Sequence, residues 1–321
     1  IFGCMDSTAS NYNPLATVDD SSCCYSSNEL WSQIGQDVDG IGINEWNGWS
    51  SDISADGSII AMGAILNDAG GTNSGHVRVF ENISGTWTQI GQDINGENAQ
   101  DWNGYSISLS SDGSILAVGA LSHDSNGSNS GRVRVFENIS GTWTQIGQSL
   151  DGVGAGDSFG LYVDLSDNGS MLAVGAPYAT GNQISSGHVQ VFENVSGTWT
   201  QVGQNINGDL TDDSFGWSVS FNNNGNILAI GAFGAGGFSN NINGYVKVFE
   251  NISGIWTQIG QDLIGDNLLD EFGISVSLSG DGSILAVGAD GHDGNGSNSG
   301  LTRVFENIAG TWTQLGQDIY G

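Results

Sequence analysis

Short apolar runs alternate with polar, glycine-rich segments along the whole chain, and none of the runs shows the 3.6-residue periodicity of an amphipathic helix. Between residues 100 and 150 the runs cover 106–110, 115–120, 133–138 and 143–148, and β-branched and aromatic residues are frequent in them. Asp112-Gly113 separates the first two runs, and this dipeptide is typical of type I′ hairpin turns. We therefore expect four short antiparallel strands here and an all-β chain.

This four-run pattern returns about every 56 residues. One tryptophan per copy opens a near-repeat of WTQIGQ, and the intervals between these tryptophans are 56, 56, 56, 57 and 56 residues. The six residues are Trp31, Trp87, Trp143, Trp199, Trp256 and Trp312. Repeats of this length stack, so that each unit buries its faces against its neighbours. Four antiparallel strands per unit predict a β-propeller with these tryptophans packed between blades.

The strands do not occur in equal numbers. The first three strands of the pattern occur five times and the tryptophan strand six times, which predicts a five-bladed propeller over residues 29–321 with one spare outer strand. Either the strand at Trp312 completes the fifth blade, or the strand at Trp31 closes the ring. The spare strand either overlaps the other terminus or pairs with an exposed edge of another molecule.

The long loops are expected at one end of the blades. In a meander, the connections from strand 2 to 3 and from strand 4 to the next strand 1 share one end, and this end receives all the long, variable loops. Those from strand 2 to 3 are 66–74, 122–130, 178–186, 234–243 and 292–299. Because binding surfaces are usually built from loops on a rigid scaffold, we expect the function at this long-loop end.

An N-terminal element of about 28 residues differs from the repeats. It holds all three cysteines, Cys4, Cys23 and Cys24, and is too small to be stabilised by core burial alone. We favour a disulfide between Cys4 and Cys23, which leaves Cys24 as a free thiol or as a link to another chain. The predicted domains are therefore 1–28 and 29–321.

The chain is strongly acidic. Its 35 acidic and 5 basic residues give a net charge of −30, which excludes nucleic acid and anionic membrane surfaces as partners. No apolar run approaches the roughly 20 residues that span a bilayer, so no membrane insertion is expected. Such a surface suits saline water or divalent cations, or serves solubility alone. The sequence begins and ends within its patterns, so we expect a processed product or a segment of a longer protein.

The segment 157–177, DSFGLYVDLSDNGSMLAVGAP, resembles the FG-GAP repeats of integrin-like β-propellers. Phe-Gly stands at Phe159, Phe215 and Phe272, whereas the first two repeats have Asn47 and Asn103 in its place. The resemblance implies calcium in the loop between strands 1 and 2. Here that loop has shrunk to a turn with too few carboxylates for a calcium shell, so we expect no calcium there. Asp112 and its counterparts Asp56, Asp167 and Asp281 are expected to be turn residues with positive φ.

The N-terminal element resembles a small disulfide module of secreted surface proteins, with the pattern GC-x-D, NYNP-x-A and DD-x-SC. The resemblance implies an extracellular or cell-surface location. It also suggests a calcium ion as cofactor, although the same side chains serve equally well as turn caps. The candidate ligands are Asp6, Asn11, Asn13, Asp19 and Asp20.

One acidic position recurs in every repeat, three residues before the glycine that opens the first strand. The residues are Glu45, Asp101, Asp157, Asp213 and Asp270. Hydrogen bonds that these carboxylates accept from loop amides would explain the repetition. The alternative is a ring of carboxylates that collects a cation near the axis.

Four Asn-x-Ser sequons fall in the turn between strands 3 and 4. They are Asn82, Asn138, Asn194 and Asn251. These asparagines are candidates for N-glycosylation in a eukaryotic secretory pathway. Ordinary turn chemistry accounts for them as well.

No nucleophile, base or acid pair breaks the repeat pattern, so we expect no enzyme activity. The resemblance favours an extracellular or cell-surface adhesion module that binds a protein or a glycan through the long-loop end. The alternative is a structural subunit of an extracellular filament that self-assembles by strand or terminus exchange. A secreted glycan-active enzyme comes third.

Overall fold

The computed structural model describes residue 5 and residues 14–18, 32–234 and 243–321. The chain divides into two compact units, residues 1–37 and residues 38–321. Several sequence predictions lie outside the described residues: the boundary at 28/29, the bridge between Cys4 and Cys23, and the strand at Trp31. The candidate cation ligands Asp6, Asn11, Asn13, Asp19 and Asp20 lie outside them too.

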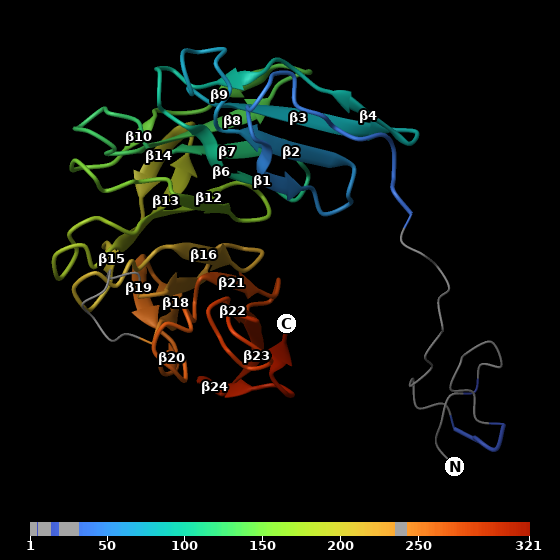
Figure 1. Cartoon of the computed structure of the whole chain (residues 1–321), viewed down its shortest axis with the longest axis vertical. Helices are drawn as coiled ribbons and strands as arrows, with labels where there is room; N and C mark the ends of the chain where they lie inside the picture. Colours follow the sequence, from blue (N-terminus) through green and yellow to red (C-terminus); the bar gives the residue numbers. More distant parts are fainter. Residues whose placement is uncertain (1–4, 6–13, 19–31, 235–242) are drawn as a thin grey trace. The chain divides into compact units, whose positions relative to one another are not determined.

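Twenty-five strands and no helix are found in the described residues, and they form five antiparallel sheets, here called blades 1 to 5 (Figure 1). Because no helix is present there, none crosses a membrane. Blade 1 contains β1 (Asn47–Ile53), β2 (Ile59–Ala64), β3 (His76–Ile83), β4 (Thr86–Gln89) and β5 (Ile94–Asn95). Blade 2 contains β6 (Asn103–Leu109), β7 (Ile115–Ala120), β8 (Arg132–Asn138), β9 (Trp143–Gln145) and β10 (Leu150–Asp151).

The other three blades repeat this plan. Blade 3 contains β11 (Tyr162–Leu165), β12 (Met171–Ala176), β13 (His188–Val195), β14 (Thr198–Gln201) and β15 (Ile206–Asn207). Blade 4 contains β16 (Ser218–Phe221), β17 (Ile227–Ala232), β18 (Tyr245–Ile252), β19 (Ile255–Gln258) and β20 (Leu263–Ile264). Blade 5 contains β21 (Ser275–Leu278), β22 (Ile284–Ala289), β23 (Leu301–Ile308), β24 (Thr311–Gln314) and β25 (Ile319–Tyr320).

Within each blade the four predicted strands pair in sequence order, which confirms the five-bladed all-β prediction. The fifth, two-residue strand was not predicted. In blade 2 the tryptophan strand was expected over 143–148, but β9 ends at Gln145 and β10 pairs with β8 again after a break. Gly147 lies in the break with a φ of 73°, a conformation that interrupts a strand and that glycine tolerates best.

The turn between β6 and β7 differs from the predicted type I′ turn. The amide of Gly113 donates to the carbonyl of Ser110 at 2.8 Å, and Gly113 alone has a positive φ within this turn. Asp112 instead accepts hydrogen bonds through Oδ1 from the Ser114 amide at 2.9 Å and the Ser110 hydroxyl at 2.7 Å. The expectation of positive φ at this aspartate was therefore wrong, because capping the turn through its carboxylate is what this position does.

Asp56 and Asp281 cap their turns in the same way as Asp112. Asp167 does not, because the capping position of blade 3 is taken by Asn168. Asp167 lies one residue earlier, and its amide donates to the Asn223 carbonyl of the next blade at 2.9 Å.

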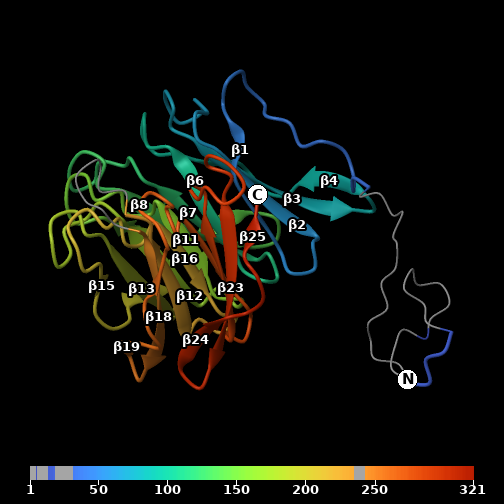
Figure 2. The same cartoon turned by 60° about the horizontal axis from the view of Figure 1, so that its bottom comes forward.

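Successive blades pack through their inner strands. Strand contacts join β1 with β6, β6 with β11, β11 with β16 and β16 with β21. Figure 2 shows β6, β11 and β16 side by side. Each hydrophobic cluster of the core combines side chains from two neighbouring blades, such as Val133 of blade 2 with Val174 and Trp199 of blade 3. The core therefore lies between the blades, as expected for units that depend on their neighbours.

The outer tryptophans lie at these contacts between blades. Trp143 is 3% exposed, and its Nε1 donates to the carbonyl of Ile90 in blade 1 at 3.0 Å. Gln92 of blade 1 donates through Nε2 to the Trp143 carbonyl at 2.6 Å. Trp199, Trp256 and Trp312 repeat both contacts with their preceding blades, and Trp87 is half-buried.

A ladder of backbone hydrogen bonds links the turns that follow the inner strands. The Ala55 amide donates to Ser111, Ser111 to Asp167, Asp167 to Asn223, and Asn223 to Gly280, at 2.7–2.9 Å. Each bond runs from one blade to the next. β24, which contains Trp312, is paired within blade 5. The strand predicted at Trp31 lies outside the described residues.

Candidate ligand-binding site at the long-loop end

Four of the ten tryptophans fall outside the 56-residue period, and all four come to the long-loop end of the inner strands. Trp46 and Trp49 flank the start of β1, Trp102 precedes β6, and Trp217 precedes β16. Further aromatic residues join them from neighbouring strand ends. The complete group, here called the aromatic cluster, is Trp46, Trp49, Trp102, Tyr105, Tyr162, Tyr178, Trp217 and Phe233.

The first part of the aromatic cluster belongs to blades 1 and 2. Trp46 stacks on Trp49 with ring centroids 5.5 Å apart. Trp49 contacts Tyr105 at 5.3 Å, and Tyr105 stacks with Trp102 at 6.4 Å. These rings make one continuous group across the contact between the two blades, at separations that aromatic pairs favour.

The second part belongs to blades 3 and 4 and is centred on Trp217. Its ring lies 4.5 Å from Phe233, 6.0 Å from Tyr162 and 6.3 Å from Tyr178. Trp49, Tyr105 and Tyr162 line one pocket of about 310 Å³, so the two parts of the cluster share it.

Much of this aromatic surface is open to solvent. Trp46 is 54% exposed, Trp49 45% and Tyr178 42%, whereas the periodic Trp143 is 3% exposed. Contiguous exposed aromatic surface is uncommon in soluble proteins and marks sites of interaction.

Backbone strain accompanies the cluster. Trp46 has a φ of 56° and Trp102 a φ of 54°, in the left-handed region that bulky side chains rarely adopt. The same position holds Ser158 in blade 3 and Ser214 in blade 4, which suit a tight turn better. In blade 5 the position holds Glu271 with a φ of 57°, so the conformation belongs to the repeat, and in blades 1 and 2 it carries a tryptophan.

The recurrent acidic residues fix the loops that carry these side chains. Asp101, which directly precedes Trp102, accepts through Oδ2 from the amides of Asn98 at 2.7 Å and Glu97 at 3.1 Å. Asp213 accepts from the Leu210 amide at 2.6 Å and from the Tyr245 hydroxyl at 2.7 Å.

The other three acidic residues are placed similarly. Asp157 and Asp270 accept from the amides of Gly154 and Asn267, and Glu45 accepts from the side chain of Asn67. Within the described ranges, no group of three or more His, Cys, Asp or Glu side chains is placed to hold a metal ion. The structure therefore does not bring the five carboxylates together.

The pocket is electrically neutral. No lysine or arginine lines it, and Ser50, Ser51 and Ser106 supply its hydroxyl groups. Ser50 and Ser106 donate to the carbonyls of Gly104 and Gly160 in the following blades. Burial raises the pKa of the phenols of Tyr105 and Tyr162, so both stay neutral hydrogen-bonding groups at ordinary pH.

The candidate glycosylation sites lie at the opposite end of the blades. Asn82 accepts through Oδ1 from the amide of Gly85 at 2.8 Å, in the turn between β3 and β4. Asn138, Asn194 and Asn251 make the same bond in their blades. A glycan at any of the four would leave the aromatic cluster uncovered.

Comparison with known proteins supports the resemblance seen in the sequence. Residues 267–305 match the FG-GAP repeat. No curated protein matches the chain. Among solved structures, a protein from Bacteroides uniformis provisionally assigned as a 6-phosphogluconolactonase has a TM-score of 0.51 and 13% sequence identity, with 85% of each chain covered.

This likeness corrects one prediction. We expected the sequence to exclude an enzyme, and this expectation was wrong, because a protein assigned as an enzyme shares the fold. Repeated sequence can mask a catalytic residue, since a side chain that recurs in every repeat need act in only one. At 13% identity the likeness shows the fold alone and assigns no activity to this chain. Residues 267–305 thus match an FG-GAP repeat, and the described residues form a β-propeller array of five antiparallel blades.

Proposed function

We propose that this array is an extracellular or cell-surface binding module that holds a neutral glycan on the aromatic cluster. The observation that carries the proposal is the contiguous, partly exposed aromatic surface at the long-loop end, where Trp46, Trp49 and Tyr178 are 42–54% exposed. FG-GAP repeats support a binding role at the cell surface, and adhesion is the role that such a module would serve.

The chemistry of the pocket favours a sugar. The C–H faces of a pyranose ring are apolar and slightly positive, and they stack on the electron-rich faces of indole and phenol rings. Sugar hydroxyls then find polar partners in the serine and tyrosine hydroxyls of the same pocket. A volume of about 310 Å³ lies at the lower end of the range of ligand pockets.

The charge of the protein further limits the class of glycan that can bind. With a net charge of −30 and no basic residue at the pocket, sulfated or carboxylated glycans would be repelled. We therefore propose a neutral oligosaccharide rather than an acidic one.

The test is a glycan array followed by calorimetry with the best neutral ligand. Trp49→Ala and Trp217→Ala should each weaken binding at least tenfold, because each removes a stacking surface. Tyr320→Ala is the control, since Tyr320 is 44% exposed and lies outside the cluster. It should bind as the wild type does.

Two results would contradict the proposal. One is an array on which no neutral glycan binds while the protein is folded by circular dichroism. The other is a ligand whose affinity is unchanged in both tryptophan variants.

A further inference from the structure

The chain contains a single lysine, Lys247, among its five basic residues. It lies on β18, at a repeat position that holds arginine in blades 1, 2 and 5, namely Arg78, Arg134 and Arg303. Both kinds of side chain carry a positive charge. Only lysine ends in a primary amine that can lose its proton and then attack a carbonyl carbon. Blade 4 therefore carries a potential nucleophile where three other blades carry a permanent cation.

The amine of Lys247 contacts a carboxylate of the loop that leads into blade 4. Lys247 is 9% exposed, and its Nζ donates to Oδ2 of Asp209 at 2.5 Å. Because Cγ of Asp209 is bonded to that oxygen, Cγ lies at most one C–O bond farther from Nζ. A second carboxylate oxygen, Oδ2 of Asp262, lies 3.6 Å from the same Nζ. An amine, a carboxyl carbon and a further carboxylate thus meet at one point.

The loop that carries Asp209 is fixed on blade 4. Asp213 is fully buried and accepts from the Leu210 amide at 2.6 Å and from the Tyr245 hydroxyl at 2.7 Å. The ring of Tyr245 in turn lies 5.6 Å from Nζ of Lys247. An amine and a carboxylate do not condense readily in dilute water. Two groups held in reacting geometry, however, reach effective concentrations of about 10⁵–10⁸ M, which favours the bond between them.

The strand register places the second carboxylate beside the lysine. Val246 of β18 pairs with Leu263 of β20. Lys247 follows Val246 and Asp262 precedes Leu263, so the two side chains start from neighbouring positions on antiparallel strands. Asp262 is therefore held by the blade itself and not by a loop.

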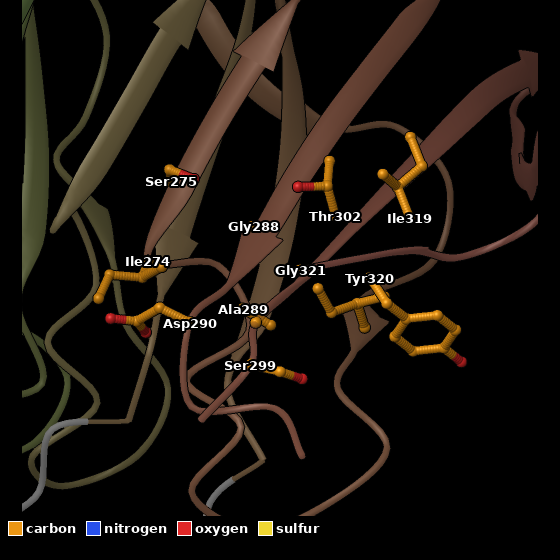
Figure 3. A pocket seen from close by; sticks show the side chains of 12 residues that line it. Ile274, Ser275, Gly288, Ala289, Asp290, Ser299, Thr302, Ile319, Tyr320 and Gly321 are labelled. Carbon is orange, nitrogen blue, oxygen red and sulfur yellow. The ribbon is translucent and has the colours of Figure 1, made fainter. Parts of the chain in front are cut away.

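Blade 5 shows the contact that an arginine makes at the same place. Arg303 donates through Nη2 to Asp266 and through Nε to Asp318 at 2.9 Å. Asp318 directly precedes Ile319, which pairs with Thr302 and lines with it a pocket of about 370 Å³ (Figure 3). A guanidinium keeps its proton at any ordinary pH and does not attack a carboxyl carbon. In blade 5 the contact therefore stays an ion pair.

We propose that Lys247 and Asp209 join in an isopeptide bond, an amide between Nζ and Cγ that forms within the folded chain. The Nζ–Cγ bond forms, and one Cγ–O bond of Asp209 breaks. Nζ gives up two protons, which leave with the detached oxygen as water. Asp262 accepts one of these protons from Nζ and passes it to the departing oxygen. An ammonium and a carboxylate thus become one neutral amide and one water, and no oxidant or cofactor is consumed.

The surroundings let the water leave. Asp209, Tyr245 and Asp262 line a pocket of about 340 Å³, and the Asp209 side chain is 52% exposed. The bond ties the connection between blades 3 and 4 to the third strand of blade 4. Because the repeats contain no cysteine, no disulfide can serve this purpose there. A covalent link of this kind limits the freedom of the unfolded chain and so favours the folded state.

The test is the intact mass of the full chain, produced without glycosylation and reduced before measurement. The wild type should be lighter than its sequence by the mass of one water. Tandem mass spectrometry of its digest should show a branched peptide that joins Lys247 to Asp209, and trypsin should leave the chain uncut after Lys247. Lys247→Arg is the matched control, because it keeps the ion pair as blade 5 does. This variant should have the full mass of its sequence.

Two further variants separate the bond from the ion pair. Asp209→Ala removes the carbon that is attacked and should also have its full sequence mass. Asp262→Ala removes the proton carrier and should contain at least ten times as much of the unlinked form as the wild type. Asp-Gly pairs can lose water by forming succinimides, but that loss does not depend on Lys247 and would appear equally in Lys247→Arg.

Three outcomes would overturn the proposal. The first is a wild type with the full mass of its sequence. The second is a Lys247→Arg variant that has lost one water to the same extent as the wild type. The third is complete tryptic cleavage of the wild type after Lys247, since an acylated lysine is not a cleavage site.

Discussion

At the scale of single residues, aspartate and serine share one position that links the inner strands. Asp164 accepts through Oδ2 from the Phe221 amide of the next blade at 2.6 Å. Ser108 of blade 2 accepts from the Leu165 amide of blade 3 at 3.0 Å. Ser220 of blade 4 accepts from the Leu278 amide of blade 5 at 3.0 Å. A carboxylate and a hydroxyl thus accept equivalent hydrogen bonds from the backbone of the next blade. Only the carboxylate titrates.

Asp164 should make stability depend on pH. Desolvation of its carboxylate, together with the charge of Asp52, raises the pKa of Asp164 to about 7. Its unfolded pKa is near 3.8, so the folded state holds the proton more tightly between these values. Stability from this group is complete below about pH 4 and is lost as the pH rises through 7.

The measurement is the melting temperature of the wild type and of Asp164→Asn from pH 4.5 to 7.5. The wild type should lose stability relative to the variant as the pH rises. Asp164→Ser, which copies Ser108 and Ser220, should behave like Asp164→Asn. Parallel curves for all three proteins would contradict the assignment.

Trp143 should be among the most costly residues to truncate. Its ring is 3% exposed between blades 1 and 2, and its Nε1 donates to Ile90. Trp143→Ala should lower the free energy of unfolding by about 3–5 kcal/mol, measured by urea denaturation. Ile83→Ala is a suitable control, because Ile83 is 52% exposed and should change stability little. An unchanged denaturation midpoint for Trp143→Ala would exclude the packing described here.

At the scale of strands and blades, Gly231 and Gly288 occupy equivalent positions in blades 4 and 5 but differ in the atoms around them. Gly231→Ala should cost at least about 2 kcal/mol, since the new Cβ meets the rigid carbonyl of Gly273. Gly288→Ala should cost much less, because its Cβ meets only the rotatable hydroxyl of Ser275. Thermal melts of both variants test this, and equal losses would contradict the difference in their surroundings.

The strands themselves could be predicted from alternation and turn residues, since both are local signals. The two-residue strands could not, because β10 forms only where the chain returns to β8 after the break at Gly147. The turn type was also missed. Asp-Gly suits several turns, and the hydroxyls of Ser110 and Ser114 favour one in which Asp112 accepts their hydrogen bonds.

At the scale of the whole molecule, blades with two neighbours should be more stable than blades with one. The side chains of β16 are mostly buried, whereas those of β21 alternate between exposed and half-buried. In hydrogen exchange, the amides of Ser275–Leu278 should therefore exchange faster than those of Ser218–Phe221. Equal protection of the two strands would contradict this order.

The candidate site could be predicted only in part from the sequence. The long-loop end could be predicted from the meander, and the four tryptophans outside the period were a signal available in the sequence. Their assembly was not predictable, because Trp217 meets Tyr178 and Phe233 only through the ends of other strands. The recurrent carboxylates are the more regular signal in the sequence, yet the structure places them at loop amides.

The contacts between blades also set the order in which the blades can fold during synthesis. Four of the outer tryptophans donate to the preceding blade, which has already emerged from the ribosome when they are synthesised. They are Trp143, Trp199, Trp256 and Trp312. A new repeat therefore meets a finished surface as it emerges, and need not wait for the end of the chain. Nascent chains stalled after blade 3 should already protect blades 1 and 2 from protease. The blades of this protein would then fold one after another during synthesis, each new blade packing on the blade before it.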